Sequence, residues 1–168
     1  MKLLTASLLA TALAAAVVAP VQAADNADFK VLIDIDASCD VVSTQNIDFD
    51  TQFANAGTLN ATGEVVVQCT NGQAYDVQLD GGGGNDVSAR RMVNAAGTDS
   101  VAYQLYQDAG RSDVWGQTDG TDTVPGTGTG YGSGATFDRV HTVYAQATLV
   151  GDELAGAYED TVTATVTF

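Results

Sequence analysis

Residues 65–79, VVVQCTNGQAYDVQL, carry the clearest pattern in the chain. Apolar side chains occupy alternate positions on both sides of an Asn71-Gly72 pair: Val65, Val67 and Cys69 before it, and Tyr75, Val77 and Leu79 after it. A period of two is typical of a β-strand with one buried face, and Asn-Gly is typical of a tight turn. This stretch therefore predicts two strands joined by a turn.

The same alternation recurs along the chain. It is found in residues 29–35, 101–105 and 162–168, and residues 140–150 are rich in β-branched and aromatic side chains. No long segment has the period of an amphipathic helix. Short strands separated by clusters of Gly, Asn and Asp predict an all-β fold, an antiparallel β-sandwich. No domain boundary is visible between residues 24 and 168, so we expect one domain there.

Residues 1–23 have the composition of a cleaved export signal. Lys2 precedes an apolar run that reaches Val18, Pro20 ends the run, and Val21-Gln22-Ala23 offers small residues for cleavage after Ala23. The run is shorter than the ~20 residues of a membrane-spanning helix, although an uncleaved anchor is the alternative. Removal of 23 of the 168 residues leaves a mature chain of 145.

The mature chain is strongly acidic. Without Lys2 it has five Lys and Arg against 21 Asp and Glu, a formal charge of −16. Such a polyanion repels phosphate backbones and anionic headgroups, which argues against nucleic acid or direct membrane insertion. A hydrophobic content of 45% argues against intrinsic disorder.

Cys39 and Cys69 are the only cysteines of the chain. Export to an oxidising compartment would allow them to form a disulfide. Closing a loop of about thirty residues removes on the order of 3.5 kcal/mol of denatured-state entropy in the chain-entropy model. A two-cysteine metal site is the alternative, but further ligands are missing.

Few side chains are suited to catalysis. His141 is the only histidine, and no GxSxG motif places a nucleophilic serine. The abundant carboxylates leave a glycosidase-like pair open, although most of them lie in turns or on polar strand faces. The GGGGND stretch at residues 81–86 matches a calcium-binding signature that requires tandem repeats, and the chain has one copy. We expect no catalytic residue, no cofactor, no metal ion and no enzyme activity.

Two glycine-rich stretches, residues 81–86 and 116–134, interrupt the predicted strands. Glycine supplies positive φ and flexibility, so both stretches predict exposed loops. The second is long for a compact domain. It predicts a mobile segment, with a binding role as the alternative.

Both ends of the mature chain carry apolar alternation. Phe29, Val31, Ile33 and Ile35 follow the cleavage site closely, and the last alternating run reaches Phe168, the final residue. A terminus frays unless a partner holds it, and an exposed apolar strand favours aggregation. One interpretation is a sandwich short of one strand, completed by the leading strand of another molecule. The other is an ordinary first strand paired within its own domain.

Across residues 28–168 the chain resembles the spore coat protein U domain, found in secreted bacterial proteins and in subunits of archaic chaperone–usher pili. The matching pieces are Cys39, Asp48-Phe49, residues 65–72, Tyr75, Leu79, Gly81-Gly82, Arg91-Met92, residues 103–108, Trp115-Gly116 and residues 156–168. Their order and spacing carry the resemblance. Asp50 and Ala145 stand where the family commonly has glycine.

The resemblance implies an incomplete immunoglobulin-like sandwich that a periplasmic chaperone completes temporarily. An outer-membrane usher then exchanges the chaperone strand for the N-terminal strand of the next subunit. It implies that residues 24–36 are the donor-strand segment, with Phe29, Val31, Ile33 and Ile35 as donor side chains. It also implies the acceptor groove residues Val162, Ala164, Val166 and Phe168, a Phe168 carboxylate offered to the chaperone, and a Cys39–Cys69 disulfide.

The resulting prediction is a structural subunit of a surface pilus, or fimbria, that serves adhesion and biofilm formation. Its partners would be the periplasmic chaperone, the outer-membrane usher, and copies of itself or related subunits. It would pass through the periplasm to the cell surface or be secreted. Two alternatives stay open: a spore-coat or matrix protein folded as a self-sufficient monomer, and a carbohydrate-binding module or hydrolase that uses residues 116–134.

Overall fold

The computed structural model describes residues 24–168, and the predicted export signal lies outside the described residues. The chain divides into two units, one that ends at Asp34 and a body from Ile35 to Phe168. Every strand of the described part belongs to the body. Nowhere between residues 24 and 168 is there a helix both long and apolar enough to cross a membrane.

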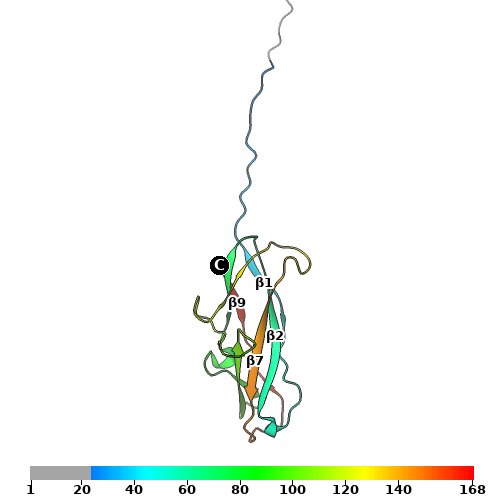
Figure 1. Ribbon diagram of the computed structural model, residues 1–168, viewed down its shortest axis with the longest axis vertical. Helices are drawn as coiled ribbons and strands as arrows, with labels where there is room; N and C mark the ends of the chain where they lie inside the picture. The colour runs from blue at the N-terminus through cyan, green and yellow to red at the C-terminus, as the bar shows by residue number, and fades with distance from the viewer. Residues whose placement is uncertain (1–23) are drawn as a thin grey trace, which may run out of the picture. The chain divides into compact units, whose positions relative to one another are not determined.

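The body is an antiparallel β-sandwich (Figure 1). Its strands are β1 (Cys39–Gln45), β2 (Thr58–Cys69), β3 (Ala74–Leu79), β4 (Arg91–Asn94), β5 (Ser100–Tyr106), β6 (Val124–Thr127), β7 (Arg139–Thr148), β8 (Tyr158–Glu159) and β9 (Ala164–Thr167). Two short 3-10 turns, η1 (Ala54–Ala56) and η2 (Gly82–Gly84), complete the regular structure. One sheet has the order β1-β2-β7-β5-β4-β8 and the other the order β6-β3-β9.

The two strands predicted in residues 65–79 are β2 and β3, which lie in opposite sheets and do not pair with each other. The alternating side chains point into the space between the sheets, where Val67 and Val77 are fully buried. Gly72 supplies the positive φ of 81° that the connecting turn requires. Trp115 fills the core between the sheets and donates a 2.8 Å hydrogen bond from Nε1 to the carbonyl oxygen of Val77.

The structure corrects the prediction of a strand at residues 29–35. These residues have no regular secondary structure in the described chain, and Phe29, Val31 and Ile33 are 86, 85 and 84% exposed. Apolar alternation gives a segment the capacity to pair, but a strand forms only where a free edge accepts its hydrogen bonds.

The glycine-rich stretches are also less exposed than predicted. Residues 124–127 form β6, which pairs with β3, and Gly81, Gly116 and Gly128 are buried. A Cβ on Gly126 would lie 2.2 Å from Cζ of Tyr75, so this glycine makes room for an aromatic ring. The glycines of these low-complexity stretches therefore allow close packing as well as backbone flexibility.

The turn after Phe49 has the positive φ expected of a glycine, although Asp50 occupies that position. Asp50 adopts a positive φ of 58°, and its backbone N–H donates a 2.8 Å hydrogen bond to Oδ1 of Asp48. Aspartate tolerates this left-handed conformation because its short side chain bonds locally. Ala145 lies in β7 and is fully buried.

Candidate functional site: an open groove between two sheet edges

The last strand of the chain is bonded on one side only. β9 pairs with β3, from Leu79 opposite Ala164 to Asp76 opposite Thr167, and no strand of the described residues pairs with its other edge. β1 is likewise the edge of the larger sheet and pairs only with β2. Both edges therefore present backbone N–H and C=O groups that an added strand can bind.

An open groove of ≈ 480 Å³ runs beside these edges. Its apolar lining consists of Ile47, Phe49, Val65, Leu79, Met92, Leu105, Val143, Val162 and Ala164. Tyr103 and Tyr158 lie among them, and Glu64, Glu159 and Asp160 are the acidic residues of the lining. The groove thus offers apolar pockets, unpaired backbone on its flank and a net negative charge, which suits an extended peptide.

Asp160 fixes one wall of the groove. It accepts a 2.6 Å hydrogen bond from the hydroxyl of Tyr103 and a 2.8 Å bond from the N–H of Gly83 in η2. Burial, followed by the hydrogen bond to Asp160, raises the pKa of the Tyr103 hydroxyl, so this group stays protonated and donates. The wall is consequently held in one position before any ligand arrives.

The four predicted acceptor residues fall in different surroundings. Val162 and Ala164 line the groove. Val166 is half-buried against the core, opposite Val77, and Phe168 is 60% exposed at the end of the chain. The donor residues Phe29, Val31, Ile33 and Ile35 lie outside every strand, each at least 78% exposed.

Sequence reasoning missed the opposite wall of the groove. Ile47 and Phe49 follow β1 and pack beside the core, and Met92 and Tyr103 come from β4 and β5. The apolar residues at positions 47 and 49 carried a usable signal, because they repeat the alternation found elsewhere. The convergence of these three segments could not be inferred without the strand order.

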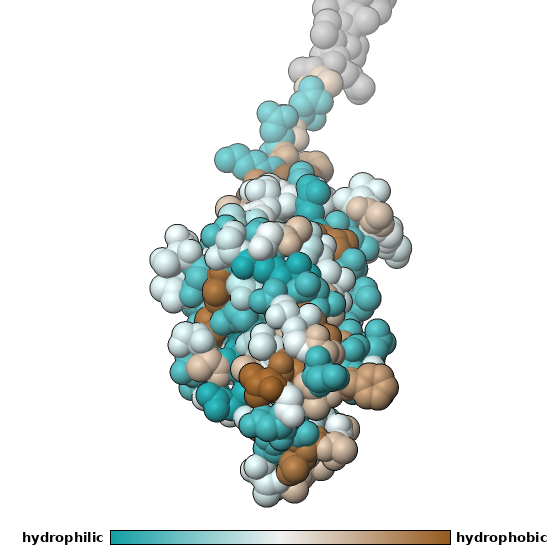
Figure 2. Space-filling model, turned by 60° about the horizontal axis from the view of Figure 1, so that its bottom comes forward, coloured by the Kyte–Doolittle hydropathy of each residue, from teal (hydrophilic) through white to brown (hydrophobic). Residues whose placement is uncertain are grey.

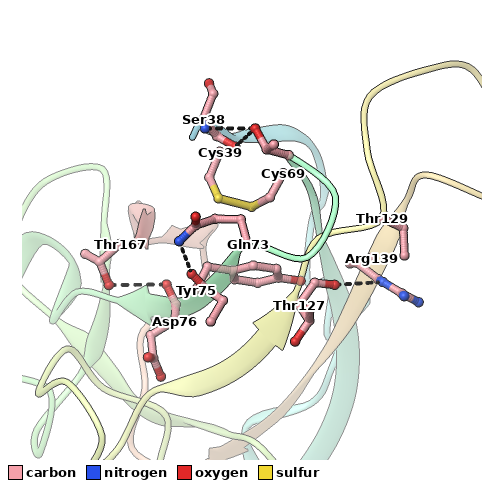
Figure 3. Close-up of a disulfide and its surroundings, with 12 residues drawn as sticks. Ser38, Cys39, Cys69, Gln73, Tyr75, Asp76, Thr127, Thr129, Arg139 and Thr167 are labelled. Atoms are coloured by element: carbon pink, nitrogen blue, oxygen red, sulfur yellow. Dashed lines mark hydrogen bonds between the residues drawn. A yellow bond between two sulfur atoms is a disulfide. The ribbon is translucent and has the colours of Figure 1, made fainter. Parts of the chain in front are cut away.

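The predicted disulfide is confirmed. Cys39 and Cys69 are joined, S–S 2.03 Å, at positions that face each other across β1 and β2 (Figure 3). Beside it, Ser38 donates from its N–H to Oγ1 of Thr70 at 3.0 Å, and Thr70 donates from its N–H to the carbonyl of Ser38 at 2.9 Å. These bonds tie the residues that precede β1 to the body, at an end that we call the disulfide end.

His141 lies in a half-buried aromatic cluster. Its Nε2 is 2.9 Å from the hydroxyl of Tyr75, and its ring packs edge-on against Tyr75 and Trp115. Burial, with a smaller contribution from Arg139, lowers the pKa of the imidazole. No acidic residue or serine hydrogen-bonds to His141 within the described chain.

The acidic residues are dispersed over the body. Among residues 24–168, no three His, Cys, Asp or Glu side chains gather closely enough to hold a metal ion. Several carboxylates instead accept backbone N–H groups of their own turns, as Asp108 does from Ser112 and Asp113. These bonds lower the pKa of Asp108 and close the turn.

The chain is similar to known proteins. The model of the Spore Coat Protein U domain family matches residues 25–165. Protein U of Myxococcus xanthus is 36% identical over 116 residues, 66% of this chain and 61% of that protein, so the match spans less than two thirds of the relative.

Two solved structures are also similar. One is the CsuC–CsuE chaperone–tip adhesion subunit pre-assembly complex from the archaic chaperone–usher Csu pili of Acinetobacter baumannii, with 22% identity and a TM-score of 0.48. That match covers 79% of this chain and 40% of the other. The second is a chaperone–tip adhesin complex of CFA/I fimbriae biogenesis, with 13% identity, a TM-score of 0.47, and coverage of 78% and 41%.

Proposed function

Because the chain belongs to the Spore Coat Protein U domain family, we propose that it is a structural subunit of a surface pilus that polymerises by donor-strand exchange. One observation carries the proposal: the unpaired edge of β9 borders an apolar groove, while the same chain leaves an alternating apolar segment exposed. Residues 24–36 of one subunit would form the missing strand of its neighbour.

The proposed donor segment and the groove are chemically complementary. The donor side chains Phe29, Val31, Ile33 and Ile35 would enter the groove beside Val162 and Ala164, and each would gain about 1.5–3 kcal/mol on full burial. The donor backbone would bind the free N–H and C=O groups of β9. The interaction needs no metal ion, cofactor or catalytic residue, since folding itself supplies the free energy.

The direction of the donor strand determines the type of assembly. β9 runs toward the disulfide end, because Thr167 pairs with Asp76 near the start of β3. A donor parallel to β9 would place the two disulfide ends together and favour closed reciprocal dimers. A donor antiparallel to β9 places the disulfide end of one subunit at the opposite end of the next. That contact is heterologous and builds an open filament, so we propose the antiparallel arrangement.

A free groove is a liability before assembly. Its apolar lining and unpaired edge favour aggregation, so a periplasmic chaperone would cover it during transit. An outer-membrane usher would then direct the exchange, and the assembled fibre would serve adhesion and biofilm formation at the cell surface.

The proposal is tested by sizing the mature chain with and without residues 24–36. The full mature chain should form a ladder of oligomers, and the shortened chain should not. The shortened chain should bind a synthetic peptide of residues 24–36 and gain thermal stability from it. Oligomers that persist after the deletion would contradict the proposal and favour a self-sufficient coat or matrix protein.

A further inference from the structure

The end of the body opposite the disulfide carries exposed apolar side chains. Phe53, Val150 and Leu154 are 83, 76 and 57% exposed. They lie on loops that are bonded together, since Leu149 donates to the carbonyl of Gly57 at 2.9 Å and Leu154 donates to Oδ2 of Asp99 at 2.7 Å. Figure 2, which brings this end forward, shows brown and tan apolar atoms among teal polar ones. We call Phe53, Val150 and Leu154 the loop-end patch.

The chain that leaves the disulfide end has little slack. Ser38 is bonded to Thr70, and the carbonyl of Asp36 accepts a 3.4 Å hydrogen bond from Oγ1 of Thr70. If Ile35 fills the last donor position, only Asp36, Ala37 and Ser38 connect the groove of one subunit to the body of the next. Three residues span at most about 11 Å. Two successive bodies must therefore touch.

The donor subunit would present a specific surface at this contact. The glycine-rich segment is fixed at the disulfide end, because Gly130 donates to the carbonyl of Cys69 at 2.9 Å and Gln68 donates to the carbonyl of Gly132 at 3.0 Å. Between these two glycines, Tyr131 is 43% exposed. It is the exposed aromatic residue of this segment, and glycines on both sides leave its ring accessible.

We propose that the loop-end patch packs against the disulfide end of the donor subunit, around Tyr131, as a second contact between neighbours in the filament. This inference rests on the proposed function, since it requires an antiparallel donor strand. The partner is a second copy of this chain. Apolar contact is the fitting chemistry, because both ends belong to an acidic subunit whose carboxylates repel those of its neighbour.

Cross-linking of the full mature chain tests this contact. In a variant with Leu154→Cys and Tyr131→Cys, a short bismaleimide should join neighbouring subunits into a covalent ladder on a denaturing gel. The matched control pairs Tyr131→Cys with Thr165→Cys, an exposed position in the middle of β9. The control should give at least about tenfold less ladder. Equal ladders from both pairs, or none from either while polymers persist, would overturn the inference.

A second pair of variants separates this inference from the donor-strand proposal. Ile33→Asp should abolish polymers, and polymers that survive it would count against the proposed function itself. Phe53→Ser with Leu154→Ser should leave polymers able to form but make them dissociate about tenfold faster in urea, equivalent to about 1.4 kcal/mol. An unchanged dissociation rate would overturn the inter-subunit contact alone.

Discussion

Arg90 holds together the region where β3, β5 and the Trp115 segment meet. It is 1% exposed, and its guanidinium donates to the carbonyls of Leu79, Asp80 and Trp115 and to Oε1 of Gln104 at 2.6–2.9 Å. Burial lowers the pKa of this group, but an arginine remains charged in proteins. Its acceptors are mostly backbone carbonyls that nothing else could satisfy without rearrangement.

Replacement of this residue should therefore be severe. Arg90→Met leaves several buried acceptors unsatisfied and should lower the free energy of unfolding by at least about 3 kcal/mol. Its neighbour Arg91 is exposed, so Arg91→Met is a matched control with an expected change within about 0.5 kcal/mol. Urea denaturation measures both. Similar stabilities of the two variants would show that the Arg90 network contributes little.

His141 should make stability depend on pH. Burial favours the neutral imidazole, so its pKa in the folded protein lies below the ordinary value of 6.5. The unfolded chain then binds more protons than the folded one below pH 6.5, and the free energy of unfolding should fall as the pH drops from about 6.5 toward 5. His141→Gln should flatten this interval. A slope that survives the substitution would assign the effect to other groups.

The carboxylates act in a separate pH range. Hydrogen bonds from backbone N–H groups lower the pKa of Asp108 and Glu153, and both are surface groups. Their stabilisation is present above their ordinary pKa values and is lost as the pH falls through the lowered ones. Measurements between pH 5 and 6.5 therefore report His141 with little interference.

At the scale of elements, the two faces of the donor segment should be unequal. Ile33 and Leu32 are both large, apolar and exposed, at 84 and 82%, but they belong to opposite phases of the alternation. Ile33→Asp should abolish polymer formation because it places a charge in the groove. Leu32→Asp should reduce it by less than about threefold, because this side chain would face outward. Size-exclusion chromatography distinguishes the two, and equal losses would contradict a β-strand donor.

The alternation of apolar residues was sufficient to predict β2, β3, β5 and β7. Each of these strands packs one face on the core and pairs with a neighbouring strand on both sides. The positions that become buried are therefore visible in its sequence. β6 was missed because its one glycine, Gly126, makes room for the ring of Tyr75 rather than forming a turn. The short strands β4 and β8 are too brief for any period to be visible.

The position of the groove could not be predicted from the sequence. The groove depends on which edges stay unpaired, and strand order is not encoded in local alternation. Residues 29–35 have the same pattern as β3 and yet have no regular secondary structure. The alternation indicates that a segment can form a β-strand. Where it forms one depends on the strand edge with which it pairs.

For the whole molecule, charge should slow assembly at low salt. Residues 24–168 have a formal charge of −16, to which residues 24–36 contribute one lysine and four aspartates. Under the proposed function, this acidic segment would enter a groove whose lining includes Glu64, Glu159 and Asp160. Because the Debye length falls from about 30 Å at 0.01 M to 8 Å at 0.15 M, polymerisation should be several-fold faster at the higher ionic strength. Light scattering measures the rate of polymerisation. Slower polymerisation at the higher ionic strength would contradict this prediction.

The central claim is that the free edge of β9 receives a strand from another copy of the chain. Hydrogen exchange tests it directly on the peptide that covers residues 163–168, compared between polymers of the mature chain and the Ile33→Asp monomer. The account predicts that amides of this peptide on the open edge exchange quickly in the monomer and become protected in the polymer, while β3 stays protected in both. Equal exchange of residues 163–168 in the two samples would contradict it.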